Sequence, residues 1–324
     1  MLTDLLNKHL KVDINKMRKT NFLESQREFE LKMISNVNNK NGWKEISVCP
    51  LCNFGKYVKE FDKYGIPLVK CEKCELRFQV KIPGDSNAVY QDDNYTVYTK
   101  EDSCEHYEYR KERFGRERVQ LLERHCGRLA KKKILDVGCG NGYFLSVAKE
   151  AGAFCFGSEF SEKLRKFTLK EVVVPVYRES LDNFPEKDFD IITIFDVLEH
   201  IESPVSFMSA AAALLKEGGY IIVYTPNFDS FSIKVMKEYS SIIAPAEHLV
   251  LFSYEPAKYL GDITGLKVIH METRGLDIHS ILACQDYRGE ARNEFLVKWV
   301  DELQAMIDVS GAADYMRVIY RKGC

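Results

Sequence analysis

The feature that most constrains the fold of this chain is a run in which an apolar segment breaks into glycines at alternate positions. Residues 134–137 have the character of a buried strand, and residues 143–145 resume an apolar pattern after Gly138, Gly140 and Gly142. Glycine adopts backbone angles that other residues avoid, and it lets a ligand approach the main chain closely. The run therefore predicts a strand, a tight turn and a helix, with a ligand at the turn.

A second apolar segment, Phe154–Ser158, ends directly before Glu159. In dinucleotide-binding folds, an acidic side chain at the end of the second strand accepts hydrogen bonds from both hydroxyls of a ribose. The two segments together predict a βαβ unit that holds a nucleoside-containing cofactor. An ordinary βαβ unit without a ligand is the alternative interpretation.

The spacing of the glycines distinguishes one class of cofactor from another. Dinucleotide enzymes usually carry G-x-G-x-x-G facing a pyrophosphate, whereas here Asp136 precedes a tighter G-x-G-x-G. This pattern resembles the first motif of class I S-adenosylmethionine-dependent methyltransferases, and the resemblance spans about residues 115–324. It implies that Glu159 binds the ribose and that Phe160 lies against the adenine. It also implies that S-adenosylmethionine lies across the turn formed by Asp136, Gly138, Cys139, Gly140 and Gly142.

Further segments follow in the order that the resemblance implies. Residues 189–196 read as an apolar strand, and Val197-Leu198-Glu199-His200 follows, like the family's fourth strand and its D-V-L-E-H segment. That segment lines the cofactor and the methyl-transfer pocket in the family, so Asp196 and Val197 are expected in the cofactor site. Residues 204–215 read as a helix, and residues 220–225, 266–273 and 316–320 read as the fifth, sixth and seventh strands.

This alternation of strands and helices predicts an α/β fold. The expected architecture is a Rossmann-like seven-stranded sheet with helices on both faces. The resemblance implies that the seventh strand is antiparallel.

Two histidines are candidates for catalysis, because they follow strands whose carboxyl ends form the ligand crevice of this fold. His200 follows the fourth strand and His248 follows the fifth. Imidazole is well suited to accept a proton near neutral pH, and His248 is the first choice as the base. A structural role for each histidine is one alternative, and Asp196 or Glu199 as the base is another.

Four cysteines have the spacing of a metal site. Cys49 and Cys52 form one C-x2-C pair, and Cys71 and Cys74 form a second. Two such pairs can complete a tetrahedron of thiolates, which favours Zn²⁺ over hard cations. A closed four-thiolate site has no open position, so we expect one structural zinc per chain that lets a small module fold. Four ordinary buried cysteines are the alternative.

The motifs divide the chain into four parts. We expect an N-terminal helical segment (1–42), a zinc-ribbon module (43–82), a connector (83–115) and the methyltransferase domain (116–324). The connector either packs on the domain surface or forms a lid, in which an aromatic ring near the sulfonium would gain about 0.5–2 kcal/mol of cation–π attraction. Its tyrosines are Tyr90, Tyr95, Tyr98, Tyr107 and Tyr109.

Hydropathy and charge exclude some classes of protein. No apolar run approaches the roughly 20 residues that a membrane-spanning helix needs, and residues 1–10 form an amphipathic pattern and not a signal peptide. We therefore expect a cytoplasmic protein without a membrane span. The formal net charge of −2 provides no overall field that would attract a polyanion.

The acceptor is suggested by resemblance alone. The stretch Glu247-His248-Leu249 and the order of the two modules resemble methyltransferases of deoxysugar and surface-polysaccharide pathways. This implies O-methylation of a sugar, sugar nucleotide or glycan intermediate, and thus a role in carbohydrate biosynthesis. The alternative is an RNA or protein methyltransferase that binds its substrate through the zinc ribbon, although acidic residues interrupt the basic ones in that module. The segment 275–315 is expected to cover the substrate or to form a homodimer contact.

Overall fold

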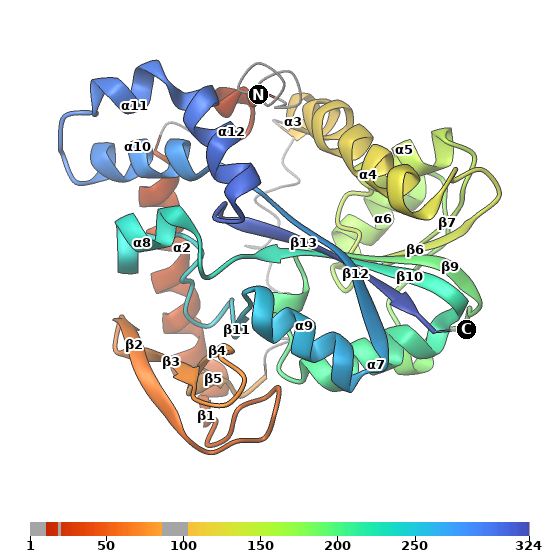
Figure 1. Ribbon diagram of the computed structural model, residues 1–324, viewed down its shortest axis with the longest axis horizontal. Helices are drawn as coiled ribbons and strands as arrows, with labels where there is room; N and C mark the ends of the chain where they lie inside the picture. The colour runs from red at the N-terminus through yellow and green to blue at the C-terminus, as the bar shows by residue number, and fades with distance from the viewer. Residues whose placement is uncertain (1–10, 19–20, 86–102, 324) are drawn as a thin grey trace.

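The computed structural model describes residues 11–18, 21–85 and 103–323, and its centre is a seven-stranded sheet (Figure 1). The strand order is β12-β13-β10-β9-β6-β7-β8. β13 is antiparallel to both of its neighbours, and the strands from β10 to β8 pair in parallel. The predicted α/β fold with an antiparallel seventh strand is therefore confirmed. The strands are β6 (Lys133–Val137), β7 (Phe154–Ser158), β8 (Val176–Tyr177), β9 (Phe189–Phe195), β10 (Leu215–Pro226), β12 (Leu266–Arg274) and β13 (Tyr315–Lys322).

Helices cover both faces of this sheet because successive apolar residues of a strand point to opposite sides. On β9, Ile191 packs in a core with Leu145 of α5, while Ile192 packs in a core with Met208 of α7. Both isoleucines are fully buried. The helices of the two faces are α4 (Arg116–Cys126) and α5 (Tyr143–Glu150) on one side, and α7 (Pro204–Leu214) and α9 (Tyr254–Ile263) on the other.

A second, smaller sheet combines distant parts of the sequence. Its order is β11-β4-β3-β2, and β11 (Val250–Leu251) pairs antiparallel with β4 (Arg77–Gln79). The other two strands are β3 (Ile66–Cys71) and β2 (Tyr57–Lys63). Buried residues around the cysteines, including Leu76 and Phe78, belong to the same hydrophobic cluster as the α7 face of the large sheet. The cysteine-rich segment is thus packed into the core of the chain.

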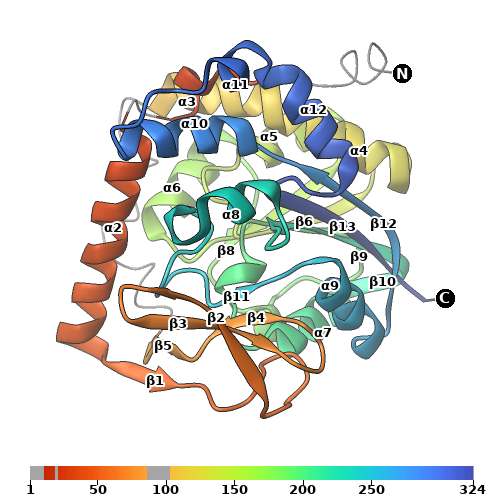
Figure 2. The same cartoon turned by 60° about the vertical axis from the view of Figure 1, so that its left-hand side comes forward.

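An N-terminal helix, α2 (Phe22–Asn36), lies alongside the small sheet and extends to α10 (Figure 2). Glu30 of α2 forms a buried ion pair with Lys63 of β2, with 2.8 Å between Oε2 and Nζ. Lys63 also donates a hydrogen bond of 2.6 Å to the carbonyl of Ile243. The helix and the small sheet are therefore tied to the loop that carries His248.

The segment between the last two strands is helical. It forms α10 (Asp277–Tyr287), α11 (Glu294–Lys298) and α12 (Val300–Ser310). Asp277 accepts hydrogen bonds from the side chain of Gln304 and from the backbone of Ser232. Phe295 and Val309 are 60% and 64% exposed, and a role of this segment in covering substrate or in dimer contact stays a prediction.

Two predictions concern residues that lie partly or wholly outside the part of the chain that the structure describes. The expected helix in residues 1–10 and the connector tyrosines Tyr90, Tyr95 and Tyr98 lie outside that part, whereas the ring of Tyr107 packs edge-on against Phe167, with 5.8 Å between the ring centroids. No helix in the described ranges has both the length and the apolar character needed to cross a bilayer.

The remaining elements of the described ranges are η1 (Ile14–Lys16), η2 (Val37–Asn41), β1 (Trp43–Glu45), β5 (Lys81–Pro83), α3 (Ser103–Arg110), η5 (Lys111–Gly115), α6 (Glu162–Glu171), η6 (Leu181–Asn183), η7 (Leu198–His200), α8 (Phe231–Met236) and η8 (Lys237–Tyr239).

Candidate functional site

The candidate cofactor residues follow parallel strands that end at one edge of the sheet. The register pairs Val137 of β6 with Ser158 of β7 and with Ile194 of β9. The glycine turn, Glu159 and Asp196 therefore begin at the same edge. This is the edge at which open α/β sheets bind their ligands.

The turn after β6 requires glycine at two positions. Gly138 and Gly142 have φ angles of +68° and +74°, which side chains disfavour. A Cβ atom on Gly138 would lie 2.5 Å from Cγ2 of Val197, and one on Gly142 would lie 2.5 Å from Cγ2 of Thr168. Val197 thus packs against the turn, and its predicted contact with the cofactor stays a prediction.

The other two residues of the turn are held by their neighbours. The hydroxyl of Thr168 on α6 donates to the carbonyl of Gly140 at 2.9 Å. The backbone N–H of Cys139 donates to the carbonyl of Ser158. Burial raises the pKa of the Cys139 thiol well above its usual range, which disfavours the thiolate form that a nucleophile needs.

Glu159 connects the turn to the end of β7. Its Oε2 atom accepts a hydrogen bond from the backbone N–H of Gly140 at 2.9 Å, and its Oε1 atom accepts one from Ser161 at 2.7 Å. A carboxylate has about four lone-pair sites, so each oxygen can accept a further bond. The adjacent Phe160 is 45% exposed, which leaves ring surface accessible. The expected contacts with ribose and adenine stay predictions.

Two acidic residues of the candidate site have different surroundings. Asp136 is 3% exposed, accepts a hydrogen bond of 2.6 Å from the hydroxyl of Thr193, and has its pKa raised to about 7 by burial. The side chain of Asp196 is 46% exposed and lies 3.3 Å from the guanidinium of Arg118. A cationic ligand at this edge would favour the charged form of Asp136.

Arg118 is a residue of the candidate site that the sequence analysis did not single out. It is 9% exposed, and its guanidinium lies 4.2 Å from the centroid of Phe195, at the end of β9. Its position is consistent with helical spacing, because buried Leu121 and Leu122 follow it at i+3 and i+4. This helical periodicity is the sequence signal that could have indicated the burial of Arg118.

The two candidate catalytic histidines lie together. Their ring centroids are 5.0 Å apart. Nδ1 of His200 donates to the carbonyl of Glu247 at 2.9 Å, and Nδ1 of His248 donates to the carbonyl of Ile242 at 2.8 Å. Because a carbonyl oxygen only accepts, Nδ1 of each ring carries the proton and Nε2 carries the lone pair. Burial lowers the pKa of His200 to about 4 and that of His248 to about 3, so both rings are neutral at pH 7.

Glu199 lies beside these histidines, a proximity that the sequence alone did not predict. It is 1% exposed, and Oε2 accepts a hydrogen bond of 2.8 Å from the hydroxyl of Thr225 at the end of β10. Its own carbonyl accepts from the backbone N–H of Leu249 at 2.8 Å. The turn after β9 and the loop before β11 are thereby joined.

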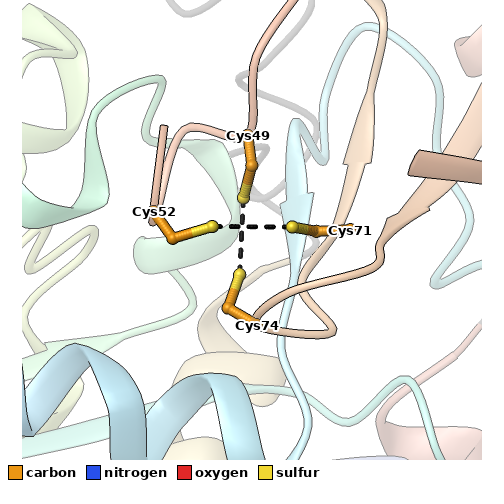
Figure 3. A group of neighbouring side chains, drawn as sticks. All are labelled: Cys49, Cys52, Cys71 and Cys74. Carbon is orange, nitrogen blue, oxygen red and sulfur yellow. Dashed lines mark hydrogen bonds between the residues drawn. The ribbon is translucent and has the colours of Figure 1, made fainter. Parts of the chain in front are cut away.

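The four cysteines of the predicted metal site face one another (Figure 3). Their Sγ atoms all lie within 4.8 Å of one another, with 3.4 Å between Cys49 and Cys74 and 3.5 Å between Cys52 and Cys71. A tetrahedron with Zn–S bonds of about 2.3 Å has sulfur–sulfur edges of about 3.8 Å. The arrangement therefore fits one zinc ion.

The two cysteine turns have the same backbone design. The N–H groups of Asn53 and Glu75 donate to the carbonyls of Cys49 and Cys71. Asn53 and Glu75 have φ angles of 55° and 61°, an uncommon conformation for residues other than glycine. The repeated geometry indicates that both turns are shaped to direct their thiols at a common point.

Comparisons with known proteins identify the family of this chain. A family model described as "Methyltransferase domain" matches residues 106–271. The chain is 31% identical over 141 residues to the ubiquinone biosynthesis O-methyltransferase of Methylococcus capsulatus, covering 41% of this chain and 56% of that protein. It is 34% identical over 118 residues to the protein of the same name from Bordetella avium, covering 34% and 49%.

The chain spans about half the length of the curated relatives that it matches. Among solved structures, a SAM-dependent methyltransferase from Archaeoglobus fulgidus aligns over 67% of this chain and 98% of its own, with 20% identity and a TM-score of 0.45. The family match covers half of the chain and includes the glycine turn, Glu159 and the segment from Asp196 to His200. The chain therefore belongs to the methyltransferase domain family.

Proposed function

We propose that this enzyme methylates a hydroxyl oxygen of a small molecule. The observation that carries the proposal is that His200, His248 and Glu199 gather at the sheet edge that carries the glycine turn. The acceptor oxygen attacks the sulfonium methyl, an O–C bond forms, and the C–S electron pair returns to sulfur to give S-adenosylhomocysteine. The hydroxyl proton has to leave, and Nε2 of His248, which carries a lone pair, is the candidate that receives it.

The first candidate acceptor is a hydroxyl of a sugar, sugar nucleotide or glycan intermediate. It rests on the order of the cysteine module and the methyltransferase domain, and on the stretch that contains His248. A second candidate is a hydroxyl on an aromatic ring of the kind from which quinones are built. It is favoured by the matched relatives, which are named ubiquinone biosynthesis O-methyltransferases.

A methyl-transfer screen with isotopically labelled S-adenosylmethionine tests both candidates. One panel contains nucleotide-linked sugars and the other contains dihydroxybenzoates, and mass spectrometry reports which product carries the label. We expect label on oxygen in the sugar panel. Label only in the aromatic panel would replace the first acceptor with the second, and label only on RNA or protein would overturn the small-molecule proposal.

We further propose that S-adenosylmethionine is held by Glu159, and we expect Glu159→Ala to weaken S-adenosylhomocysteine binding at least tenfold. Each charge-assisted hydrogen bond that is lost contributes about 1.5–3 kcal/mol, and the turn also loses the acceptor for Gly140. Isothermal calorimetry measures the effect. Glu162→Ala is the matched control, since Glu162 pairs with Lys166 on the exposed side of α6. Unchanged affinity, or tighter binding of NAD, would contradict the assignment.

We also propose that Cys49, Cys52, Cys71 and Cys74 bind one structural zinc ion per chain. The convergence of their sulfur atoms and the repeated turn geometry support this. Four thiolates leave no position for substrate, so the ion stabilises the small sheet and takes no part in methyl transfer. Residues 43–82 are then a zinc ribbon whose sheet is completed by β11.

A further inference from the structure

We propose that Glu199, His200 and His248 form a second metal site, which holds a divalent cation at the point of methyl transfer. The inference rests on the proposed function, because the cation would bind the acceptor oxygen. It assigns to His248 the role of a metal ligand in place of direct proton acceptance.

The geometry of the three side chains suits a single ion. One carboxylate oxygen of Glu199 and one ring nitrogen from each histidine lie within 4.8 Å of one another. Nitrogen and oxygen ligands about 2.0–2.2 Å from an ion lie about 3–4 Å apart. A side-chain shift of a few tenths of an ångström to about an ångström, well within rotamer freedom, therefore brings the three atoms onto one ion.

The hydrogen bonds of the two rings select the form of histidine that binds metals. Both Nδ1 atoms donate to backbone carbonyls, those of Glu247 and Ile242. This places the lone pair of each ring on Nε2 and fixes the orientation of the ring. Metal-ligating histidines almost always show such a bond from the other nitrogen. Both neighbouring histidines have this arrangement, and chance packing of two rings would not require it.

The surroundings of Glu199 call for a positive charge. Its carboxylate is almost fully buried and accepts a hydrogen bond from the neutral hydroxyl of Thr225. Within residues 11–18, 21–85 and 103–323, no lysine or arginine forms an ion pair with it. Buried carboxylates are usually paired with a cationic group or bound to a metal. The nearby Asp196 makes the surroundings more negative still.

The backbone keeps the ligands together although they come from distant parts of the sequence. The N–H of Leu249 donates to the carbonyl of Glu199, and Gln79 of β4 donates from its side chain to the carbonyl of His248 at 2.8 Å. The position of His248 is thus set on one side by the turn after β9 and on the other by the small sheet. Preorganised ligands of this kind favour a permanent site.

Two imidazoles and one carboxylate define the class of cation. This donor set suits borderline divalent ions such as Mn²⁺, Fe²⁺, Co²⁺ or Zn²⁺, and it leaves coordination positions open. An acceptor hydroxyl bound there loses its proton to water more readily. The resulting oxygen attacks the sulfonium methyl, and the C–S electron pair goes to sulfur as before. The four-thiolate site is chemically different and favours soft ions.

Binding of Mn²⁺, measured by electron paramagnetic resonance on the 324-residue chain with its zinc content determined, tests the proposal. We expect one Mn²⁺ per chain, and at least tenfold weaker binding in Glu199→Gln and His248→Gln. Thr225→Val removes the hydrogen bond to Glu199 and should weaken binding about tenfold, as loss of an outer-shell partner does. His270→Gln is the control, because His270 pairs with Glu272 on β12, outside the cluster.

Two results would overturn the metal site. The first is wild-type protein that binds neither Mn²⁺ nor Co²⁺ at millimolar concentration, and the second is equal Mn²⁺ binding by wild type and by His248→Gln. S-adenosylhomocysteine binding is measured on every variant, so that a misfolded variant is recognised and replaced by Thr225→Val. Methyl transfer that persists in protein shown by elemental analysis to contain no Mn²⁺, Fe²⁺ or Co²⁺, and no more than one Zn²⁺ per chain, would refute the metal site and leave the proposed function intact.

Discussion

His248→Gln is expected to lower turnover at least a hundredfold while S-adenosylhomocysteine affinity stays nearly unchanged. A hundredfold loss corresponds to about 2.7 kcal/mol of transition-state stabilisation, and a positioned proton acceptor contributes about 10²–10⁴-fold. Both proposed roles of His248 use Nε2, so either one is lost with the imidazole. The candidate cofactor contacts are made by the glycine turn and by Glu159, which belong to other strands.

Turnover with the labelled acceptor and calorimetry with S-adenosylhomocysteine separate the two effects. His270→Gln is again the matched control, and we expect it to retain turnover. If His248→Gln keeps most of its turnover, His248 is neither the proton acceptor nor an essential ligand. His200→Gln would then be the next variant, and a mechanism that relies on proximity alone would remain the alternative.

The parts of the fold that depend on local sequence pattern were predictable. Residues 134–142 fold as a strand and a glycine turn because burial along β6 and positive φ angles at Gly138 and Gly142 are both encoded within a few residues. The acidic residue directly after β7 was predictable from the βαβ pattern. In the structure, this residue, Glu159, accepts a hydrogen bond from the backbone N–H of Gly140. The order of the remaining strands was predictable from hydrophobic segments and from the family resemblance.

Contacts between distant segments were not predictable from those patterns. The pairing of β11 with β4 joins Val250 to Phe78, and no local feature of either segment specifies the other. The proximity of Glu199 to His248 likewise results from a backbone hydrogen bond between two loops. For this reason the sequence indicated two separate histidines and a separate zinc module, whereas the structure joins them through one small sheet.

The fifth strand begins earlier than its prediction, for a physical reason. The helix predicted over residues 204–215 is α7, which ends at Leu214, but Leu215 already pairs with Phe189 as part of β10, five residues before the predicted start of the strand at Tyr220. Gly218, with φ of +73°, lies where the β10–β9 register shifts between Leu215 and Tyr220. A left-handed glycine serves a β-bulge as well as a helix end, so the residue type alone could not distinguish them.

Cys71→Ser is expected to remove the zinc and to lower the unfolding temperature by about 10 °C. Zinc binding contributes about 10–16 kcal/mol in small zinc-binding modules, and 1 kcal/mol shifts the unfolding midpoint of a chain of this length by about 1–2 °C. Cys71 is fully buried, so the variant also leaves a hydroxyl among thiols. Elemental analysis and differential scanning calorimetry measure the two effects.

Cys126→Ser is the control, because it makes the same change at a buried cysteine of α4 outside the cluster. It should retain one zinc per chain. Wild-type protein purified without chelator that contains no zinc would contradict the zinc assignment, as would a Cys71→Ser variant that keeps its full complement.

The loss of zinc should also disturb the position of His248 in the candidate methyl-transfer site, although the ion itself takes no part in the proposed reaction. Cys71 ends β3, β3 pairs with β4, and β4 pairs with β11 immediately after His248. Gln79 of β4 holds the carbonyl of His248 directly. We therefore expect Cys71→Ser to lower turnover at a temperature where the protein is still folded, while S-adenosylhomocysteine affinity changes far less. Equal losses of turnover and cofactor affinity would indicate general unfolding, and unchanged turnover would show that the small sheet does not position His248.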